Sequence, residues 1–234
     1  MGNMFLRSQP NLINMNVFEE EAVEYDEWFE THKCVYQSEV AAIRRFIPKT
    51  GEGVEIGIGT GRFSIPFGIK VGLESARAMA EIARKRGIHA FETKAETLPC
   101  KDNSFDFALM VTALCFLKNP LKALQEIRRI LKPNGKVIIG MLDEDSPLGK
   151  FYEEKRNKSK FYRDARFYSV NHVLGWLKKL GFNNLQTIQT IFKNPGEIQG
   201  LEPIKGVSGK GLFVVPRKIK KRMFKNEVDN AYGY

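Results

Sequence analysis

Residues 54–61, Val-Glu-Ile-Gly-Ile-Gly-Thr-Gly, decide the fold of this chain. The apolar residues predict a buried strand, and the three glycines at alternate positions predict a tight turn directly after it. Glycine adopts positive φ without strain and lets a ligand approach bare main chain. Glu55 precedes the first glycine by two residues. A carboxylate there opposes an anionic pyrophosphate and favours a cationic ligand.

Strands and helices are expected to alternate after this loop, which indicates an α/β protein. Only residues 62–68, with Pro66 among them, separate the loop from the second strand, so the first crossover helix must be very short or irregular. Asn119 and Ser169 are the expected caps of two helices, and Ser75 that of a third. The expected strands are 54–58, 69–73, 88–92, 107–111 and 136–142, followed by 185–192 and 211–215, and the expected helices are 76–86, 121–131 and 170–180.

The second strand ends in Leu73-Glu74, seventeen residues beyond Gly57. A carboxylate at the end of the strand beside a glycine loop can accept both hydroxyls of a ribose. The rival interpretation is a dinucleotide fold, which needs a small residue where this chain has Arg62. Arg62 therefore argues against a nicotinamide-binding oxidoreductase.

Composition and length indicate one globular domain. The chain has 234 residues, of which 43% are hydrophobic and 27% charged. Its three cysteines and three histidines are scattered, so we expect neither a disulfide framework nor a metal site. The sequence shows no membrane span and no signal-peptide pattern, which makes the cytoplasm the expected location.

Three parts are expected along the chain. Residues 1–17 form a flexible leader, and 18–216 form the domain, with an N-terminal helical segment over 18–47. Residues 217–234 form a basic tail with six positive and two negative side chains, within a total net charge of +10. Such a tail is usually solvated, although its charge leaves RNA or an anionic surface open as a partner.

Taken together, these motifs resemble the class I S-adenosylmethionine-dependent methyltransferases, in particular the group called methyltransferase type 11. The resemblance covers about residues 25–182. It includes the glycine loop, Ala95-Glu96-Thr97-Leu98-Pro99, Ser104-Phe105-Asp106 and Leu131-Lys132-Pro133-Asn134-Gly135. The family's Asp before the Ala-Glu pair is Lys94 here, and its Leu-His-His run is Leu114-Cys115-Phe116.

The resemblance implies a three-layer Rossmann-like fold with a mostly parallel, seven-stranded sheet and an antiparallel C-terminal edge. It implies S-adenosylmethionine as cofactor, a ligand with a sulfonium, an ammonium and no phosphate. Tyr25, Trp28 and Tyr36 would belong to a helical lid over the cofactor and the substrate. The cofactor-binding residues that it implies are Glu55, Gly57, Gly59, Gly61 and Glu74, with Ala95, Glu96 and Thr112 near the adenine and the reacting end.

The expected reaction is methyl transfer by in-line displacement to a small-molecule acceptor. Alignment and exclusion of water supply most of such catalysis, so no triad or metal is needed, and the sequence identifies no catalytic residue. RNA or protein as acceptor is one alternative, motivated by the basic tail. Another is a regulator that binds S-adenosylmethionine without transferring its methyl group, motivated by the missing histidines. The acceptor atom and the oligomeric state are not indicated.

Overall fold

The computed structural model describes residues 16–206 and 209–220. The expected leader and basic tail lie mostly outside these residues. Within them, helix α1 already begins at Asn16, and strand β8 continues to Lys220, four residues into the segment expected to be tail.

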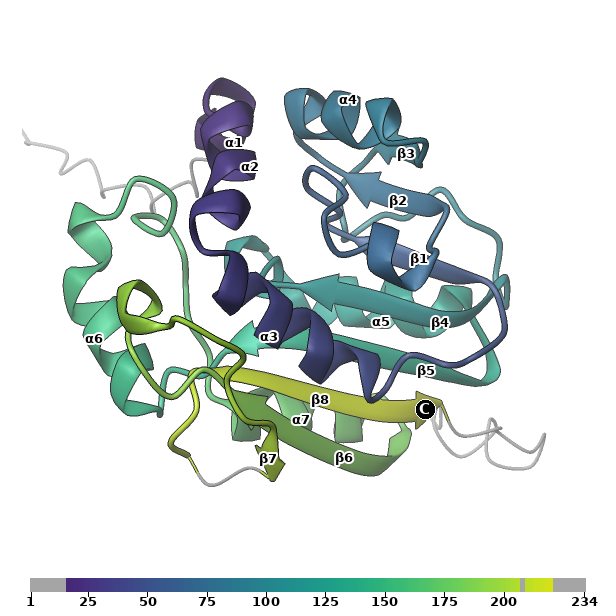
Figure 1. Cartoon of the computed structure of the whole chain (residues 1–234). Coiled ribbons are helices and arrows are strands. Elements are labelled where there is room, and N and C mark those ends of the chain that lie inside the picture. Colours follow the sequence, from purple (N-terminus) through teal and green to yellow (C-terminus); the bar gives the residue numbers. More distant parts are fainter. Residues whose placement is uncertain (1–15, 207–208, 221–234) are drawn as a thin grey trace, which may run out of the picture.

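One mixed sheet organises the molecule, with the strand order β3-β2-β1-β4-β5-β8-β6-β7 (Figure 1). The five strands on one side of the sheet are mutually parallel, and β8, β6 and β7 add an antiparallel edge. This confirms the expected fold class, with a two-residue eighth strand as an addition. The strands are β1 (Gly53–Ile56), β2 (Val71–Glu74), β3 (His89–Glu92), β4 (Phe105–Val111), β5 (Leu131–Leu142), β6 (Phe182–Thr190), β7 (Lys205–Gly206) and β8 (Phe213–Lys220).

Helices cover both faces of the sheet, as Figure 1 shows. Successive residues of a strand point to opposite faces, so in β4 Ala108 and Met110 join the core on one side, and Leu109 and Val111 the core on the other. The first core lies beneath α5 (Pro120–Ile130) and α7 (Val170–Lys179). The second lies beneath α2 (Ala22–Thr31) and α3 (Lys33–Arg44), while α4 (Arg77–Lys85) packs beside β2 and β3.

The crossover from β1 to β2 is short, as the sequence predicts. Its helical part is the 3₁₀ helix η1 (Ile65–Phe67), which ends at Gly68 with φ +69°. A second difference from an ideal fold lies in β5, which was expected over 136–142 but begins at Leu131 and therefore includes residues 132–135. The register against β4 shifts between Phe105 and Phe107, and Asn134 has φ +66°, so this segment bulges out of the strand.

Two of the three expected helix caps are confirmed. Asn119 accepts a hydrogen bond from the amide of Lys122, and Ser169 accepts one from that of His172. Ser75 is not the cap of α4. The carboxylate of Glu19 in α1 (Asn16–Glu20) accepts hydrogen bonds from the amides of Arg77 and Ala78 instead. A carboxylate at that position also favours the positive end of the helix dipole, so α1 is held against α4.

Two further helices, α6 (Pro147–Lys155) and the 3₁₀ helix η3 (Arg156–Lys158), follow β5 and lie beside the N-terminal helices in Figure 1. Short 3₁₀ helices also occur at Leu114–Phe116 (η2) and Pro195–Glu197 (η4). No helix among the described residues is long and apolar enough to cross a membrane.

Candidate active site

The glycine loop lies at the carboxyl end of β1, and its three glycines have different reasons to lack a side chain. All three have positive φ, +68°, +54° and +85°. A Cβ on Gly57 would lie 2.4 Å from that of Ala113, and one on Gly61 would lie 2.5 Å from Cδ1 of Ile88. A Cβ on Gly59 would meet only the ring of Tyr25, at 3.7 Å. Gly57 and Gly61 thus permit packing, whereas Gly59 keeps its main chain open to a cavity.

Glu74 ends β2 beside this loop and is almost completely buried, with 7% of its surface exposed. Its Oε2 accepts a hydrogen bond from the amide of Gly59 at 2.8 Å, and its Oε1 accepts from the amides of Ser75 and Ala76 at 2.8 and 3.0 Å. Burial raises the pKa of Glu74, and these amides oppose the shift by stabilising the carboxylate. The carboxylate therefore links the glycine loop to the start of α4.

A cavity opens between the glycine loop and the ends of β2 and β4, and we call it the first cavity. It has a volume of about 70 Å³ and shares Ser75, Ala95, Phe116 and Leu117 with a wider, more open groove of about 650 Å³. Five of the residues predicted to bind the cofactor line the first cavity, and Glu96 lines the groove. The five are Gly57, Gly59, Glu74, Ala95 and Thr112.

Glu55 and Gly61 are not among the residues that line these two spaces. Strand alternation explains the position of Glu55, because Ile56 faces the first cavity and its neighbour in β1 faces the opposite side. There Glu55 is 1% exposed and accepts a hydrogen bond from Oγ of Ser64 at 2.5 Å. Burial raises the pKa of Glu55 to about 8. The spacing of the glycines in the sequence did not indicate that the hydrogen-bond partner of Glu55 would be Ser64, which follows the third glycine in the same loop.

Thr112 follows β4 and has φ +49°, in the left-handed region that β-branched residues avoid. Its amide donates to the carbonyl of Gly140 at 2.8 Å, which holds the backbone in that conformation. Burial raises the pKa of Tyr25, and the side chain of Thr112 opposes this shift. Backbone strain of this kind persists where the surroundings enforce it, and it concentrates at functional sites.

Asp26 joins helix α2, the expected lid, to the glycine loop. It accepts hydrogen bonds from Arg62 and Arg86, with atom separations of 2.6 to 2.9 Å, and from the hydroxyl of Thr60 at 2.5 Å. Partial burial alone would raise the pKa of Asp26, but these donors hold that pKa well below its usual range. Arg62, which argued against a dinucleotide fold, is thus part of the contact between lid and loop.

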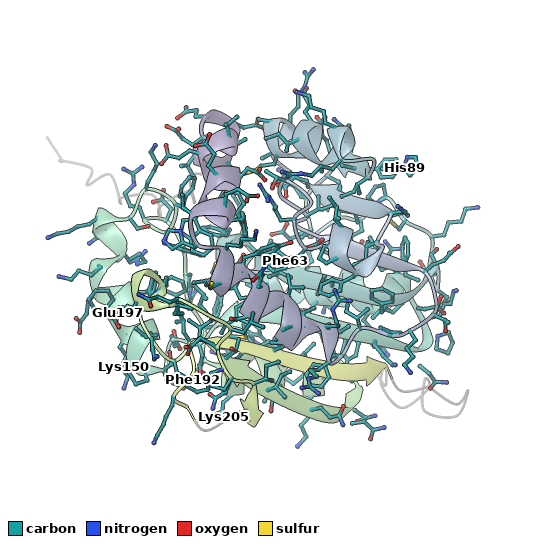
Figure 2. The ribbon with its side chains drawn as sticks, viewed as in Figure 1. Phe63, His89, Lys150, Phe192, Glu197 and Lys205 are labelled. Carbon is teal, nitrogen blue, oxygen red and sulfur yellow. The ribbon has the colours of Figure 1, made fainter. Side chains whose placement is uncertain are left out.

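A second cavity, of about 290 Å³, is lined in part by residues of α2 and α3 and adjoins the first. The two share Phe18, Tyr25, Thr112 and Phe116. Of the predicted lid residues, Tyr25 and Trp28 line the second cavity, whereas Tyr36 does not and donates its hydroxyl hydrogen to the carbonyl of Arg62 at 2.6 Å. Figure 2 shows one wall residue, Phe63, in the interior of the molecule. Other walls are Phe29, Glu39, Tyr152, Phe161 and Tyr162.

Several cavity residues were not predicted from the sequence. Phe18 and Phe116 line both cavities, and Glu39 is a carboxylate inside the second. A signal for Glu39 was present, because it stands four residues from both Val35 and Ile43, on the apolar stripe of its helix. For Phe116, the signal was its place just after the fourth strand, where parallel sheets commonly bind ligands.

Sheet order, glycine loop and strand-end carboxylate together define a class I S-adenosylmethionine-dependent methyltransferase. A family model described as a methyltransferase domain matches residues 54–139. The crystal structure of a SAM-dependent methyltransferase, possible histamine N-methyltransferase, from Thermotoga maritima is 48% identical, covers 88% of this chain and 99% of its own, and superposes with a TM-score of 0.85. The chain belongs to this methyltransferase family, and S-adenosylmethionine is its cofactor.

Other similarities are consistent with this assignment. An uncharacterized protein of Methanocaldococcus jannaschii is 52% identical over 200 residues, which is 86% of this chain and 97% of that protein. A tRNA U34 carboxymethyltransferase of Helicobacter pylori is 29% identical over 106 residues, 45% of this chain and 41% of that one. A phosphoethanolamine N-methyltransferase of Haemonchus contortus, solved with S-adenosylhomocysteine, shares the fold at 19% identity and a TM-score of 0.59, over 80% of this chain and 53% of its own.

Proposed function

We propose that this protein transfers the methyl group of S-adenosylmethionine to a small molecule held in the second cavity. The observation that carries the proposal is the junction of the two cavities at Tyr25, Thr112 and the two phenylalanines 18 and 116. A methyl group at the reacting end of the first cavity would face directly into the second. The second cavity is about 290 Å³ in volume and is roofed by the lid, which suits a small acceptor better than a macromolecule.

The residues of the first cavity fit the cofactor. The open main chain at Gly59 leaves room that a Cβ would fill, and Glu74 offers a buried carboxylate for ribose hydroxyls. The adenine would extend past Ala95 into the groove that contains Glu96. When bound, the cofactor supplies an activated methyl group on a sulfonium. The chain itself has to align the acceptor and keep water away, which the aromatic walls and the lid can do.

Glu55 has an indirect role in this proposal. Its hydrogen bond with Ser64 joins β1 to the loop after the third glycine, so it shapes the loop from beneath. Asp26 holds the same loop from above, through Thr60 and Arg62. The main chain around Gly59 is therefore held on both sides, as a preorganised binding loop requires.

Binding and turnover test the proposal separately. We expect S-adenosylmethionine and S-adenosylhomocysteine, but not NAD, to raise the melting temperature of the protein, since a ligand that binds only the folded state stabilises it. Gly59→Val should abolish this shift. Gly68→Val is the matched control, because Gly68 also has a positive φ but has open space around it. An equal loss of binding in both variants would mean that backbone strain, not the cavity, is responsible.

The acceptor class needs its own experiment. Release of S-adenosylhomocysteine is measured with a panel of small amines, phenols, thiols and carboxylates, and with total RNA. Turnover with a small molecule supports the proposal, turnover with RNA alone overturns it, and binding without any turnover favours a regulator. The role of the basic tail is tested by removing residues 221–234. A deletion from 217 would also remove the last residues of β8.

A further inference from the structure

The second cavity has an unusual combination of walls. Nine of its sixteen lining residues are aromatic, and Glu39 is the one charged residue among the sixteen. The rings come from two parts of the chain, from α2, which contributes Trp28 and Phe29, and from the segment after β5, which contributes Tyr152 and Tyr162. Aromatic faces attract cations through the quadrupole of the ring. A carboxylate among such faces therefore indicates a cationic ligand.

Glu39 also differs from the other buried acids of the described chain. It is 7% exposed, yet no hydrogen bond or ion pair joins its carboxylate to another described residue. The other three acids in this class have donors. Glu55 accepts from Ser64, Glu74 accepts from three backbone amides, and Asp143 accepts from the amides of Asp145 and Val170. A buried carboxyl without a donor costs stability, so its presence in a cavity wall points to a ligand that supplies the donor.

The position of Glu39 is set by its helix. Val35, Glu39 and Ile43 are spaced by four residues and share the buried face of α3, which packs on β5, β6 and β8. The carboxylate thus approaches the cavity from a rigid element and not from a loop, which is the more precise support for a binding group. The cavity wall also includes Thr112 and Phe116, which line the first cavity as well.

From these observations we infer that the methyl acceptor is a small amine, bound as its ammonium form between the aromatic rings and Glu39, and that Glu39 is the base that removes its proton. This inference rests on the proposed function. An anionic acceptor would be repelled by the carboxylate, and a neutral thiol or ether would leave it without a charged partner. An ammonium satisfies the carboxylate with N–H donors and the rings with its charge.

The proton and electron balance is complete without any further reactant. The ammonium N–H bond breaks, its electron pair stays on nitrogen, and the proton goes to the carboxylate of Glu39. The nitrogen lone pair then forms a bond to the methyl carbon, while the carbon–sulfur bond breaks and its electrons remain on sulfur as a thioether. The positive charge passes from sulfur to the methylated nitrogen. The proton on Glu39 leaves to water when the products depart.

The surroundings of Glu39 suit a base of this kind. Burial raises the pKa of Glu39 to about 8. This value is closer to the pKa of an ammonium group than the pKa of an ordinary carboxyl group is, which favours proton transfer between the two. The titratable groups that face it are the hydroxyls of Tyr25, Tyr152 and Tyr162. Burial raises the pKa of each of these tyrosines, so they stay neutral while Glu39 titrates.

The test uses the full-length protein saturated with S-adenosylhomocysteine and three probes of similar shape, which are benzylamine, benzyl alcohol and benzoate. Binding is measured by calorimetry. We expect benzylamine to bind the wild-type protein best, and Glu39→Gln to weaken it at least tenfold without weakening benzyl alcohol. Between pH 6.5 and 8 the affinity for benzylamine should rise in the wild-type protein, as Glu39 ionises, and stay flat in the variant. Gln37→Ala, an exposed change on the same helix, should leave all three affinities unaltered.

The failures can be told apart. If S-adenosylhomocysteine does not bind the wild-type protein, the proposed function fails. If it binds equally to wild-type and Glu39→Gln protein, the variant is folded and its cofactor site is intact. In that case, an unchanged affinity for benzylamine, or an equal affinity for benzyl alcohol or benzoate, overturns the inference. So does a wild-type protein that binds the adenosyl compound but none of a wider panel of primary and secondary amines.

Discussion

Replacement of Glu55 by glutamine should change how the stability of the protein depends on pH. Burial raises the pKa of Glu55 from the ordinary 4.5 to about 8. Between these two values the folded protein keeps a proton that the unfolded chain has released. The unfolded state then binds fewer protons, so the free energy of unfolding falls as the pH rises. Glutamine has nearly the same shape and does not titrate, which removes this contribution.

The magnitude follows from the linkage relation. One proton contributes a slope of about 1.4 kcal/mol per pH unit. From pH 5.5 to pH 7.5, Glu55 therefore lowers the free energy of unfolding of the wild-type protein by roughly 2–3 kcal/mol, and the Glu55→Gln variant does not undergo this loss. No discount for solvent screening applies, because Glu55 is 1% exposed. Glu39 contributes a slope of the same sign in both proteins and cancels in the comparison.

Urea unfolding at half-unit steps of pH measures the difference directly. We expect the free energy of unfolding of the variant, relative to that of the wild-type protein, to increase steadily from pH 5 to 7.5. Above pH 8 this difference should become constant. A constant offset, from the altered hydrogen bond with Ser64, is allowed and does not affect the slope. A stability difference that is the same at every pH in this range would refute the reasoning, because it would mean that Glu55 is ionised in the folded protein.

Two other predictions concern the lid and the thiols. Asp26→Asn should lower stability by about 1–3 kcal/mol at pH 7, after allowance for solvent screening. Because the pKa of Asp26 is lowered in the folded protein, this loss should begin to shrink as the pH falls below about 4 and should vanish only when the pH passes the lowered pKa of the folded state. A loss that does not shrink between pH 4 and pH 2 in urea melts would contradict the charge-based account. Burial raises the pKa of Cys115 to about 12, so iodoacetamide at pH 8 should modify it last of the three cysteines in the native protein. Peptide mass spectrometry checks the order, and early labelling of Cys115 would show that the segment after β4 opens readily.

The architecture was largely predictable because its signals are local. The apolar run at 54–58, the caps at Asn119 and Ser169, and the alternation of strands and helices each need only neighbouring residues. These signals together predict a parallel sheet, in which Glu74 and the glycine loop both lie at the carboxyl ends of strands. Ligands bind at these ends of parallel strands, so the place of the site was predictable too. The short crossover was predictable as well, from the few residues available between β1 and β2.

The parts that escaped prediction depend on contacts distant in sequence. The cap of α4 comes from Glu19, 58 residues away from Arg77. Glu55 was expected to face the ligand, but its strand register turns it toward Ser64. Glu39 lies in the second cavity only because α3 crosses the sheet next to the lid. Such positions are set by packing between elements, which the periodicity of one segment does not encode.

The division of the two cavities along the chain has a consequence for how this protein can diverge. Of the seventeen residues that line the first cavity, fifteen lie within 54–139, and of the sixteen that line the second, only Phe63, Thr112 and Phe116 do. The proposed donor site and the proposed acceptor site are therefore formed by different stretches of the sequence. Mutations before residue 54 or after 139 can reshape the acceptor cavity while selection for the donor holds the middle of the chain constant. Homologues with the same central segment can thus be expected to share a cofactor and to differ in what they methylate.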